Sequence, residues 1–255
     1  MSVWYCIPAK RPLAESTLPM WKAAGYRVAV CVDEAESTIV CGSRSPGSAY
    51  VDYDLIESIM PYPGYACAVN ALVRYVLAED PDCEWCCTGG DDVLPDPNHT
   101  PEEIARECSE HFGTVNDVPN FERSTFGVMQ PTGDRYGDDE RHLGEFGSAY
   151  IDRVCGSPWM GREWCLRINQ GRGPLWPEYY HMGEDEELQA IATRAGVLWQ
   201  RPDLTHYHRH WARARRDAAD MPEFLRRAND PEEWRRYKEL FAARQAAGFP
   251  GSEPL

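Results

Sequence analysis

Two adjacent acids, Asp91 and Asp92, follow a short apolar run and two glycines in the stretch CEWCCTGGDDVLPDP. A carboxylate at the end of a buried strand needs a cation, hydrogen bonds or water, because burying it without a partner is costly. Hard divalent cations take oxygen ligands, and glycines allow the backbone to approach a ligand closely. The stretch therefore indicates a site for a metal ion and a phosphate group. The alternative is a pair of acids that caps the turn through DVLPDP.

A second group of acids, Glu184 to Glu187, begins the segment EDEELQAIATRAG, which has a helical composition. Acids here are also typical of a helix N-terminus, where the helix dipole favours negative charge. Further along, His206, His208 and His210 occupy alternate positions, so a strand would carry all three on one side. Such histidines can supply a metal ligand or a phosphate contact, although a single histidine is more often structural.

Apolar runs and helical segments alternate in the first part of the chain. The expected strands are VWYCIP, YRVAVCVDE and EWCCT, and the expected helices are LAESTLPMWKAAG and GYACAVNALVRYVLAED. Strands that are apolar on both faces and alternate with helices form parallel sheets that helices cover. We therefore expect an α/β fold with a mainly parallel sheet. Ligands bind beyond the carboxyl ends of such strands, where Lys10, Asp33 and Asp91 fall.

The order of these parts resembles that of the GT-A nucleotide-sugar glycosyltransferases, especially their large inverting branch. The resemblance covers Val3–Trp211 and rests on IPAKRP, Asp33, the AVN that ends at Asn70, GGDD, EDEEL and THYHRH. It implies a GT-A (Rossmann-like) catalytic domain over residues 1–211, with residues 212–255 as a helical C-terminal extension. It also implies a nucleotide-sugar donor, with a UDP-sugar expected first, and Mn²⁺ or Mg²⁺ as the cofactor.

The resemblance also assigns roles to individual residues. Asp185 matches the position of the catalytic base, which takes the proton of the acceptor hydroxyl as it attacks the anomeric carbon. The residues alone leave this role and that of a helix N-terminus equally open. The expected metal ligands are Asp91, Asp92, His206 and His208. The expected donor contacts are Pro8, Lys10, Arg11, Asp33, Asn70, Gly90, Asp91 and Trp159. The expected acceptor contacts are Trp176, Glu184, Arg215 and Arg216.

Two features depart from the family pattern. Gly89 stands where the first acid of the D-x-D motif is expected, and PYPG replaces the Arg-x-x-Gly that often precedes the Ala-x-Asn helix. A nucleotide-sugar binding module without catalysis is therefore one rival interpretation. A nucleotidyltransferase is another, but that class needs a glycine-rich phosphate loop near the N-terminus, and IPAKRP contains no glycine.

The acceptor is less clearly indicated. The formal net charge is −15, which argues against a protein that coats polyanions nonspecifically. The segment from His206 to Arg244 is locally basic, with ten Lys or Arg and seven Asp or Glu. The chain is similar to glycosyltransferases of tailed bacteriophages, some of which modify hydroxymethylated pyrimidines in DNA. We therefore expect 5-hydroxymethylpyrimidine in phage DNA as the acceptor, with a protein or a glycan as the alternative.

The remaining signals bound the setting. The first residues, MSVWYCIPAKRP, lack the basic and apolar regions of a secretory signal, and the sequence has no apolar run long enough to cross a membrane. We expect one main domain in the cytoplasm, that of the host if a phage encodes the chain. Most of the ten cysteines lie in apolar segments and are expected in the core. Cys83 and Cys86 have the spacing of a zinc half-site, but a second pair is missing.

Overall fold

The computed structural model describes residues 2–9, 11–32, 54–58, 62–115, 124–135, 150–210, 213, 226 and 230–255. Four of the residues expected in the site lie outside the described residues: Lys10, Asp33, Arg215 and Arg216.

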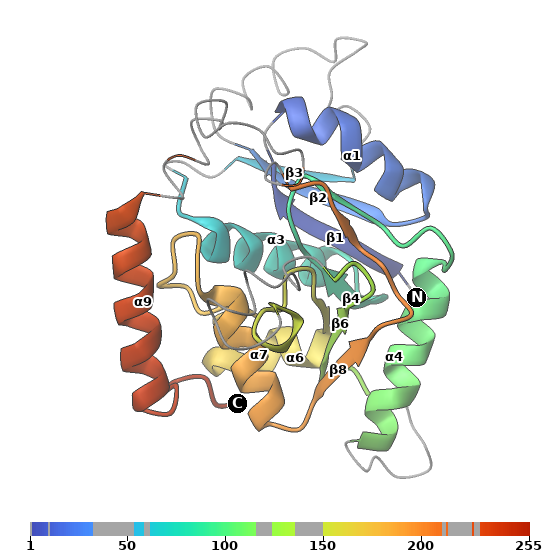
Figure 1. Ribbon diagram of the computed structural model, residues 1–255. Helices are drawn as coiled ribbons and strands as arrows, with labels where there is room; N and C mark the ends of the chain where they lie inside the picture. Colours follow the sequence, from blue (N-terminus) through green and yellow to red (C-terminus); the bar gives the residue numbers. More distant parts are fainter. Residues whose placement is uncertain are drawn as a thin grey trace.

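A sheet of seven strands forms the centre of the fold, in the order β3-β2-β1-β4-β7-β6-β8 (Figure 1). These strands are β1 (Ser2–Pro8), β2 (Arg27–Val32), β3 (Leu55–Ser58), β4 (Cys83–Cys87), β6 (Val128–Pro131), β7 (Trp159–Gly161) and β8 (Leu198–Arg201). The helices are α1 (Arg11–Ala23), α3 (Tyr65–Glu79), α4 (Pro101–Val115), α6 (Arg162–Arg167), α7 (Glu184–Arg194) and α9 (Pro231–Ala246), with short 3-10 turns at Tyr150–Asp152 and Ile168–Gly171.

The sheet is mainly parallel, as expected from the sequence. Strands β3, β2, β1 and β4 run in parallel, and so do β6 and β8. Strand β7 lies between β4 and β6 and is antiparallel to both. A separate two-stranded sheet pairs β5 (Val93–Leu94) with β9 (Tyr207–His208), so the chain beyond the main sheet returns to the segment that follows β4.

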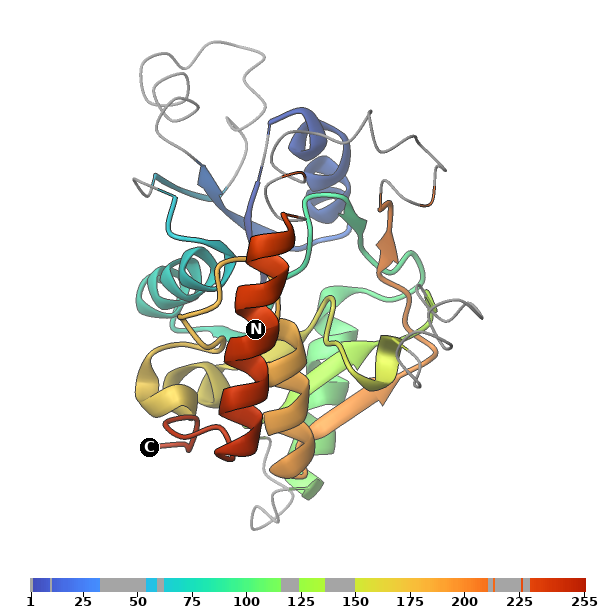
Figure 2. The ribbon, with the colours of Figure 1, turned by 60° about the vertical axis from the view of Figure 1, so that its left-hand side comes forward.

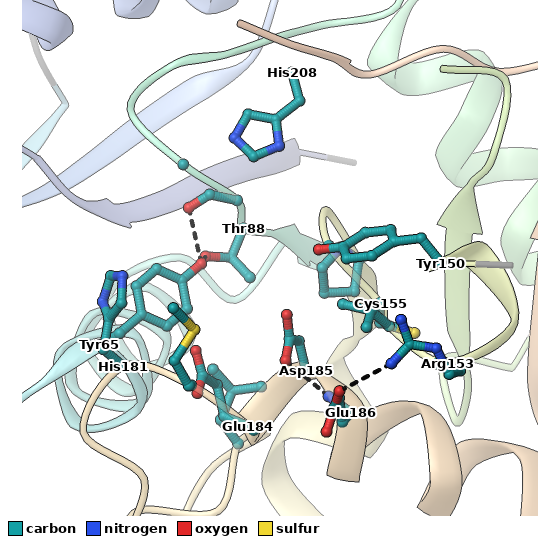
Figure 3. Close-up of a pocket in the computed structure, with 18 of the residues that line it drawn as sticks. Tyr65, Thr88, Tyr150, Arg153, Cys155, His181, Glu184, Asp185, Glu186 and His208 are labelled. Atoms are coloured by element: carbon teal, nitrogen blue, oxygen red, sulfur yellow. Dashed lines mark hydrogen bonds and ion pairs between the residues drawn. The ribbon is translucent and has the colours of Figure 1, made fainter. Parts of the chain in front are cut away.

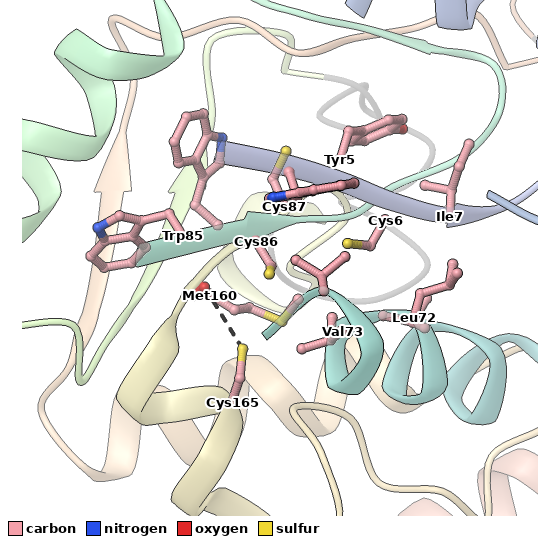
Figure 4. Packing of buried hydrophobic residues seen from close by; sticks show 14 of the residues in the cluster. Tyr5, Cys6, Ile7, Leu72, Val73, Trp85, Cys86, Cys87, Met160 and Cys165 are labelled. Carbon is pink, nitrogen blue, oxygen red and sulfur yellow. Dashed lines mark hydrogen bonds between the residues drawn. The ribbon is translucent and has the colours of Figure 1, made fainter. Parts of the chain in front are cut away.

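Helices cover both faces of the sheet. On one face, Trp21 of α1 stacks on Tyr5 with ring centroids 3.7 Å apart, and Phe112 of α4 stacks on Trp85. On the other face, Cys6 and Cys86 point toward α3 (Figure 4). Neighbouring strand residues point to opposite faces, so the apolar runs VWYCIP and EWCCT fill both layers at once. This is the physical reason why these runs do not alternate with polar residues.

Helix α9 packs beside α7 in both views of the ribbon (Figures 1 and 2). Arg244 of α9 is buried against Glu187 of α7, and Arg194 donates a hydrogen bond to the carbonyl of Gly248. The C-terminal helix is therefore part of the main body where the structure describes it. None of the helices in the described part of the chain has the length and apolar content that a membrane span requires.

One further segment differs from the sequence-based interpretation. The glycine- and proline-rich stretch 171–177 is expected from its composition to be a mobile loop, but it is anchored on α3. The amide of Asn70 donates to the carbonyl of Leu175 (2.7 Å) and accepts from its N–H (3.0 Å). Leu175 and Trp176 are buried, so this part of the segment is packed into the fold and does not form a free loop.

Candidate active site

A cavity of about 390 Å³ opens at the carboxyl end of β4 (Figure 3). Its lining comes from parts of the chain that lie far apart in sequence. They are Tyr65 of α3, residues 88–92 after β4, residues within 150–158, Leu175, residues 181–186 around the start of α7, His208 with His210, and two side chains of α9. Ligands of open α/β sheets bind at this end of the strands. The fold therefore places one cavity where the sequence predicts the ligand.

The first wall is the loop that follows β4. The hydroxyl of Tyr5 donates to the carbonyl of Gly90 (2.7 Å), and the hydroxyl of Tyr65 donates to the carbonyl of Gly89 (2.8 Å). Thr17 of α1 donates to the carbonyl of Asp91. A side chain at Gly89 would begin 3.0 Å from the Tyr5 hydroxyl. A larger residue at Gly89 would therefore require its neighbours to shift.

Asp92 and His208 are paired on the same wall. Nε2 of His208 lies 3.1 Å from Oδ1 of Asp92, because β9 pairs with β5 and places His208 opposite Val93. Burial raises the pKa of Asp92, but the hydrogen bond from His208 and the charges of His208 and His210 outweigh it, so the pKa lies below its usual value. The carboxylate is therefore ionised at neutral pH.

The opposite wall is the N-terminus of α7. Gly183 caps the helix in the left-handed conformation (φ 95°), and a side chain there would begin 2.8 Å from the Tyr179 ring. Asp185 follows in the first turn, where its Oδ1 accepts a hydrogen bond from the N–H of Glu186 (2.8 Å). Its carboxylate points into the cavity, with Tyr65 and Tyr150 on either side (Figure 3).

The acids of α7 have raised pKa values because they are buried together. Burial raises the pKa of Asp185 to about 6. Burial and the charge of Asp185 raise the pKa of Glu186 to about 7, although Arg153 lies 3.3 Å from its carboxylate. Glu184 is 5% exposed, and burial raises its pKa well above the usual value. Its Oε2 is buried and has no hydrogen-bond partner among the described residues.

No protein-family model and no curated protein sequence matches this chain. Among solved structures, a Drosophila β-1,4-galactosyltransferase 7 mutant in complex with manganese, UDP-Gal and xylobiose is 14% identical, with a TM-score of 0.45 over 87% of this chain and 75% of that one. A Bacillus anthracis protein assigned as a glucose-1-phosphate thymidylyltransferase, in complex with sucrose, is 12% identical (TM-score 0.44; 78% and 85% covered). A Vibrio cholerae nucleoside-diphosphate-sugar pyrophosphorylase is 15% identical (TM-score 0.40; 78% and 91% covered). Likenesses at this level carry no argument about the function of the chain.

The structure brings some of the residues expected from the sequence into the cavity. Gly90, Asp91, Asp92, His208, Glu184 and Asp185 line it. Others have different places. Pro8 ends β1 and Arg11 begins α1, and Pro8 does not line the cavity. Asn70 does not line it either, because its amide is hydrogen-bonded to Leu175.

The two tryptophans expected at the ligand are buried away from the cavity lining. Trp159 is fully buried in the sheet. Trp176 lies under the guanidinium of Arg244, whose Cζ is 3.3 Å from the ring centroid. Several large aromatic residues are buried in the core, so their residue type alone does not distinguish a core position from a ligand contact.

His206 also has a structural place. Its Nδ1 lies 2.7 Å from the hydroxyl of Ser157, and the indole N–H of Trp159 donates to its Nε2 at 3.5 Å. Burial lowers the pKa of His206 to about 3, so the ring is neutral. With both nitrogens bonded inside the fold, His206 holds the segment 157–159 in place, and of these two histidines it is His208 that lines the cavity.

Several cavity residues carry no clear sequence signal. Tyr65, Tyr150 and Arg153 line the cavity from segments that sequence patterns do not single out. Trp234 and Tyr237 line it from α9, three positions apart on an otherwise charged helix. This spacing puts both rings on one face, which is the only signal that could have indicated them.

Eight of the nine cysteines that the structure describes are buried, and Cys67 is partly buried. The thiols of Cys83 and Cys86 lie 3.7 Å apart, and both residues are fully buried beneath α3 and α6. The hydrogen bond with Cys6 is the main cause that raises the pKa of the Cys86 thiol above its usual value, and burial raises it further. The C-x-x-C spacing here therefore reflects strand packing.

The donor set of the first wall fits a divalent cation that a substrate helps to bind. Within the described residues, no group of three or more His, Cys, Asp or Glu side chains is gathered closely enough to enclose a metal ion. Mg²⁺ in particular is usually bound by one or two carboxylates together with substrate phosphates and water. Asp91 and Asp92, with His208 beside them, provide this kind of partial site.

Proposed function

We propose that this chain transfers a sugar from a nucleotide-sugar donor to an acceptor hydroxyl, with inversion at the anomeric carbon. One observation carries the proposal: acids face the same cavity from two opposite walls. Asp91 and Asp92 belong to the wall that also carries His208, and Asp185 lies across the cavity from His208 (Figure 3). An inverting transfer needs a leaving-group site and a base on opposite sides of the sugar.

The leaving group belongs at the first wall. As the bond between the anomeric carbon and the diphosphate oxygen breaks, the electron pair stays with the nucleoside diphosphate. Asp91 and Asp92 would hold a divalent cation, which would stabilise that negative charge. His208 accompanies Asp92 and fixes its carboxylate within the loop.

The acceptor belongs at the second wall. The acceptor oxygen forms the new bond to the anomeric carbon, and its proton passes to the carboxylate of Asp185. A base with a pKa of about 6 is ionised at neutral pH and is still basic enough to take a proton in the transition state. The Glu186 N–H bond holds the other carboxylate oxygen in position.

The DNA acceptor stays a prediction. Arg215 and Arg216 lie outside the described residues. In α9, the exposed arginines are paired with acids of the same helix: Arg235 with Glu232 (2.6 Å) and Glu239 (2.7 Å), and Arg236 with Glu233 (3.3 Å). Such pairs are typical of a solvated helix face.

The test is incubation of the protein with UDP-sugars, Mn²⁺ and a panel of acceptors, followed by mass spectrometry and NMR of the product. A sugar transferred with inverted anomeric configuration supports the proposal. Asp185→Asn should abolish transfer, while the exposed Glu79→Gln should not. Consumption of pyrophosphate with release of a nucleoside triphosphate would instead identify a nucleotidyltransferase, and donor binding without turnover would identify a binding module.

A further inference from the structure

We propose that α9 forms the acceptor subsite, in which Trp234 stacks against the ring of a neutral sugar and Tyr237 packs beside it. The inference rests on the proposed transfer and names the class of acceptor. The two side chains belong to the C-terminal extension, and neither is fully buried. The sequence of this part of the chain is locally basic. Both line the cavity.

The two rings of this aromatic surface pack edge to face next to the second wall. Their centroids lie 5.2 Å apart at an interplanar angle of 68°. Tyr237 packs directly on the cap of α7, since a side chain at Gly183 would begin 2.9 Å from its Cδ2. The charges of Glu186 and Asp185 act on the Tyr237 hydroxyl and add to the effect of burial, which is the main cause of its raised pKa. The aromatic surface is therefore adjacent to Asp185.

This position suits the acceptor rather than the donor. In an inverting transfer the acceptor approaches the anomeric carbon from the side opposite to the diphosphate. The diphosphate site is on the wall of Asp91 and Asp92, whereas α9 adjoins the wall of Asp185. A group that stacks on Trp234 thus lies on the side of the base.

The cavity offers hydrogen-bonding groups and an aromatic ring that suit a sugar acceptor. Five carboxyl groups line it, from Asp91, Asp92, Glu184, Asp185 and Glu186. The guanidinium of Arg153, which also lines it, is paired with Glu186. The carboxyl groups of Asp185 and Glu186 can hydrogen-bond to the hydroxyls of a sugar, which also offers an apolar ring face to Trp234.

The helix holds the surface in place. Asp230 caps α9 by accepting from the N–H of Glu232 (2.8 Å), and the Arg244–Glu187 pair fixes its other end. Lys238 lies 5.3 Å from the centroid of the Trp234 ring, a cation–π contact that orients the indole. The subsite is therefore preorganised and loses little entropy when it binds a ring.

The experiment measures acceptor binding separately from turnover. The p-nitrophenyl glycosides of glucose, galactose and xylose are titrated against the full chain with UDP and Mn²⁺, with saturation-transfer NMR as the readout, and a hydroxymethylated oligonucleotide is titrated in parallel. Trp234→Ala should weaken glycoside binding about tenfold, which corresponds to about 1.4 kcal/mol. Trp234→Phe should restore most of it, and Tyr75→Ala, which removes an exposed ring on α3, should bind as the native chain does.

The outcomes separate this inference from the proposed function. Glycoside binding that depends on Trp234 supports the subsite even in the absence of sugar transfer, in which case only the proposed transfer fails. Equal binding by the native chain and Trp234→Ala overturns the subsite, as does preference for the oligonucleotide. If the alanine variant does not fold, Trp234→Leu keeps an apolar side chain without the ring, and the same comparison applies.

Discussion

Arg244 and Glu187 form a buried bidentate ion pair that joins α9 to α7. Nε of Arg244 lies 2.7 Å from Oε2 of Glu187, and a terminal guanidinium nitrogen lies 2.6 Å from Oε1. The hydroxyls of Tyr179 and Ser252 donate to the same carboxylate, at 2.8 and 3.1 Å. Glu187 is two residues after Asp185, so this network fixes the turn that carries the proposed base.

Loss of one partner of this pair should destabilise the fold. Arg244→Ala leaves the Glu187 carboxylate buried without its cation, and breaking a buried pair typically costs about 3 to 5 kcal/mol. Chemical denaturation measures the change. The matched control is Arg235→Ala, whose ion pairs are exposed and should contribute less than about 1 kcal/mol. Equal effects of the two substitutions would contradict the structural role of the Arg244 pair.

Asp185→Asn should stabilise the protein above neutral pH. Because burial raises the pKa of Asp185 from 3.8 to about 6, the folded state binds more protons than the unfolded state between these values. Stability is therefore lost as the pH rises from about 4 to 6. The half-buried carboxylate should cost about 1 to 3 kcal/mol above pH 7. In thermal melting, the Tm of the variant should rise relative to that of the native chain as the pH increases. A Tm difference that stays constant with pH would contradict the raised pKa of Asp185.

Transfer should require the ionised form of Asp185. With a pKa of about 6, kcat/KM should fall tenfold per pH unit below about pH 6 and level off above it. A pH profile with a saturating donor measures this. The donor diphosphate and the cation also titrate, so the affinity for UDP and Mn²⁺ at each pH serves as the control. A flat profile down to pH 5 would remove Asp185 as the base.

Cation binding should depend on Asp92 and require the nucleotide. Isothermal titration of Mn²⁺ should show weak binding to the chain alone and tighter binding in the presence of UDP, since the protein supplies only part of the site. Asp92→Asn removes a charged ligand and should abolish the enhancement. Asp82→Asn, an exposed acid at the other end of β4, is the control. Unchanged Mn²⁺ binding in Asp92→Asn would place the cation elsewhere.

Local patterns predict the parts of this fold that local physics determines. The run EWCCT is apolar on both faces and becomes β4, and the acids of EDEEL begin α7 because a helix N-terminus favours negative charge. Helix α4 also has a local signal at its N-terminus. Thr100 and Glu103 form a capping box, in which the N–H of Thr100 donates to Glu103 (2.9 Å) and the N–H of Glu103 donates to the Thr100 hydroxyl (3.3 Å).

Other parts depend on tertiary packing and have no local signal. The reversed direction of β7 follows from its two neighbours in the sheet, which no local pattern records. Because His206 and His208 are two positions apart, a strand would carry both on one side, but this spacing does not show which ring is buried. His206 is the buried ring because the fold packs it against Trp159 and Ser157. The aromatic wall of α9 was missed for the same reason, because its role depends on where the helix packs.

Gly183→Ala should destabilise the fold by more than the cost of backbone strain alone, because the added Cβ would also clash with neighbouring rings. Gly183 has a φ of 95°, and an added Cβ would begin 2.8 Å from the Tyr179 ring and 2.9 Å from Tyr237. Gly196 ends α7 with a φ of 71° and has no atom within 4 Å of an added Cβ, so Gly196→Ala reports the cost of the conformation alone. That cost is about 1 kcal/mol, and overpacking adds about 1 to 3 kcal/mol. Denaturation of the two variants should therefore differ by about 2 kcal/mol, and the larger loss should come with weaker glycoside binding because Tyr237 must move. Equal stabilities would mean that the α7 cap and α9 are not packed as closely as these distances indicate.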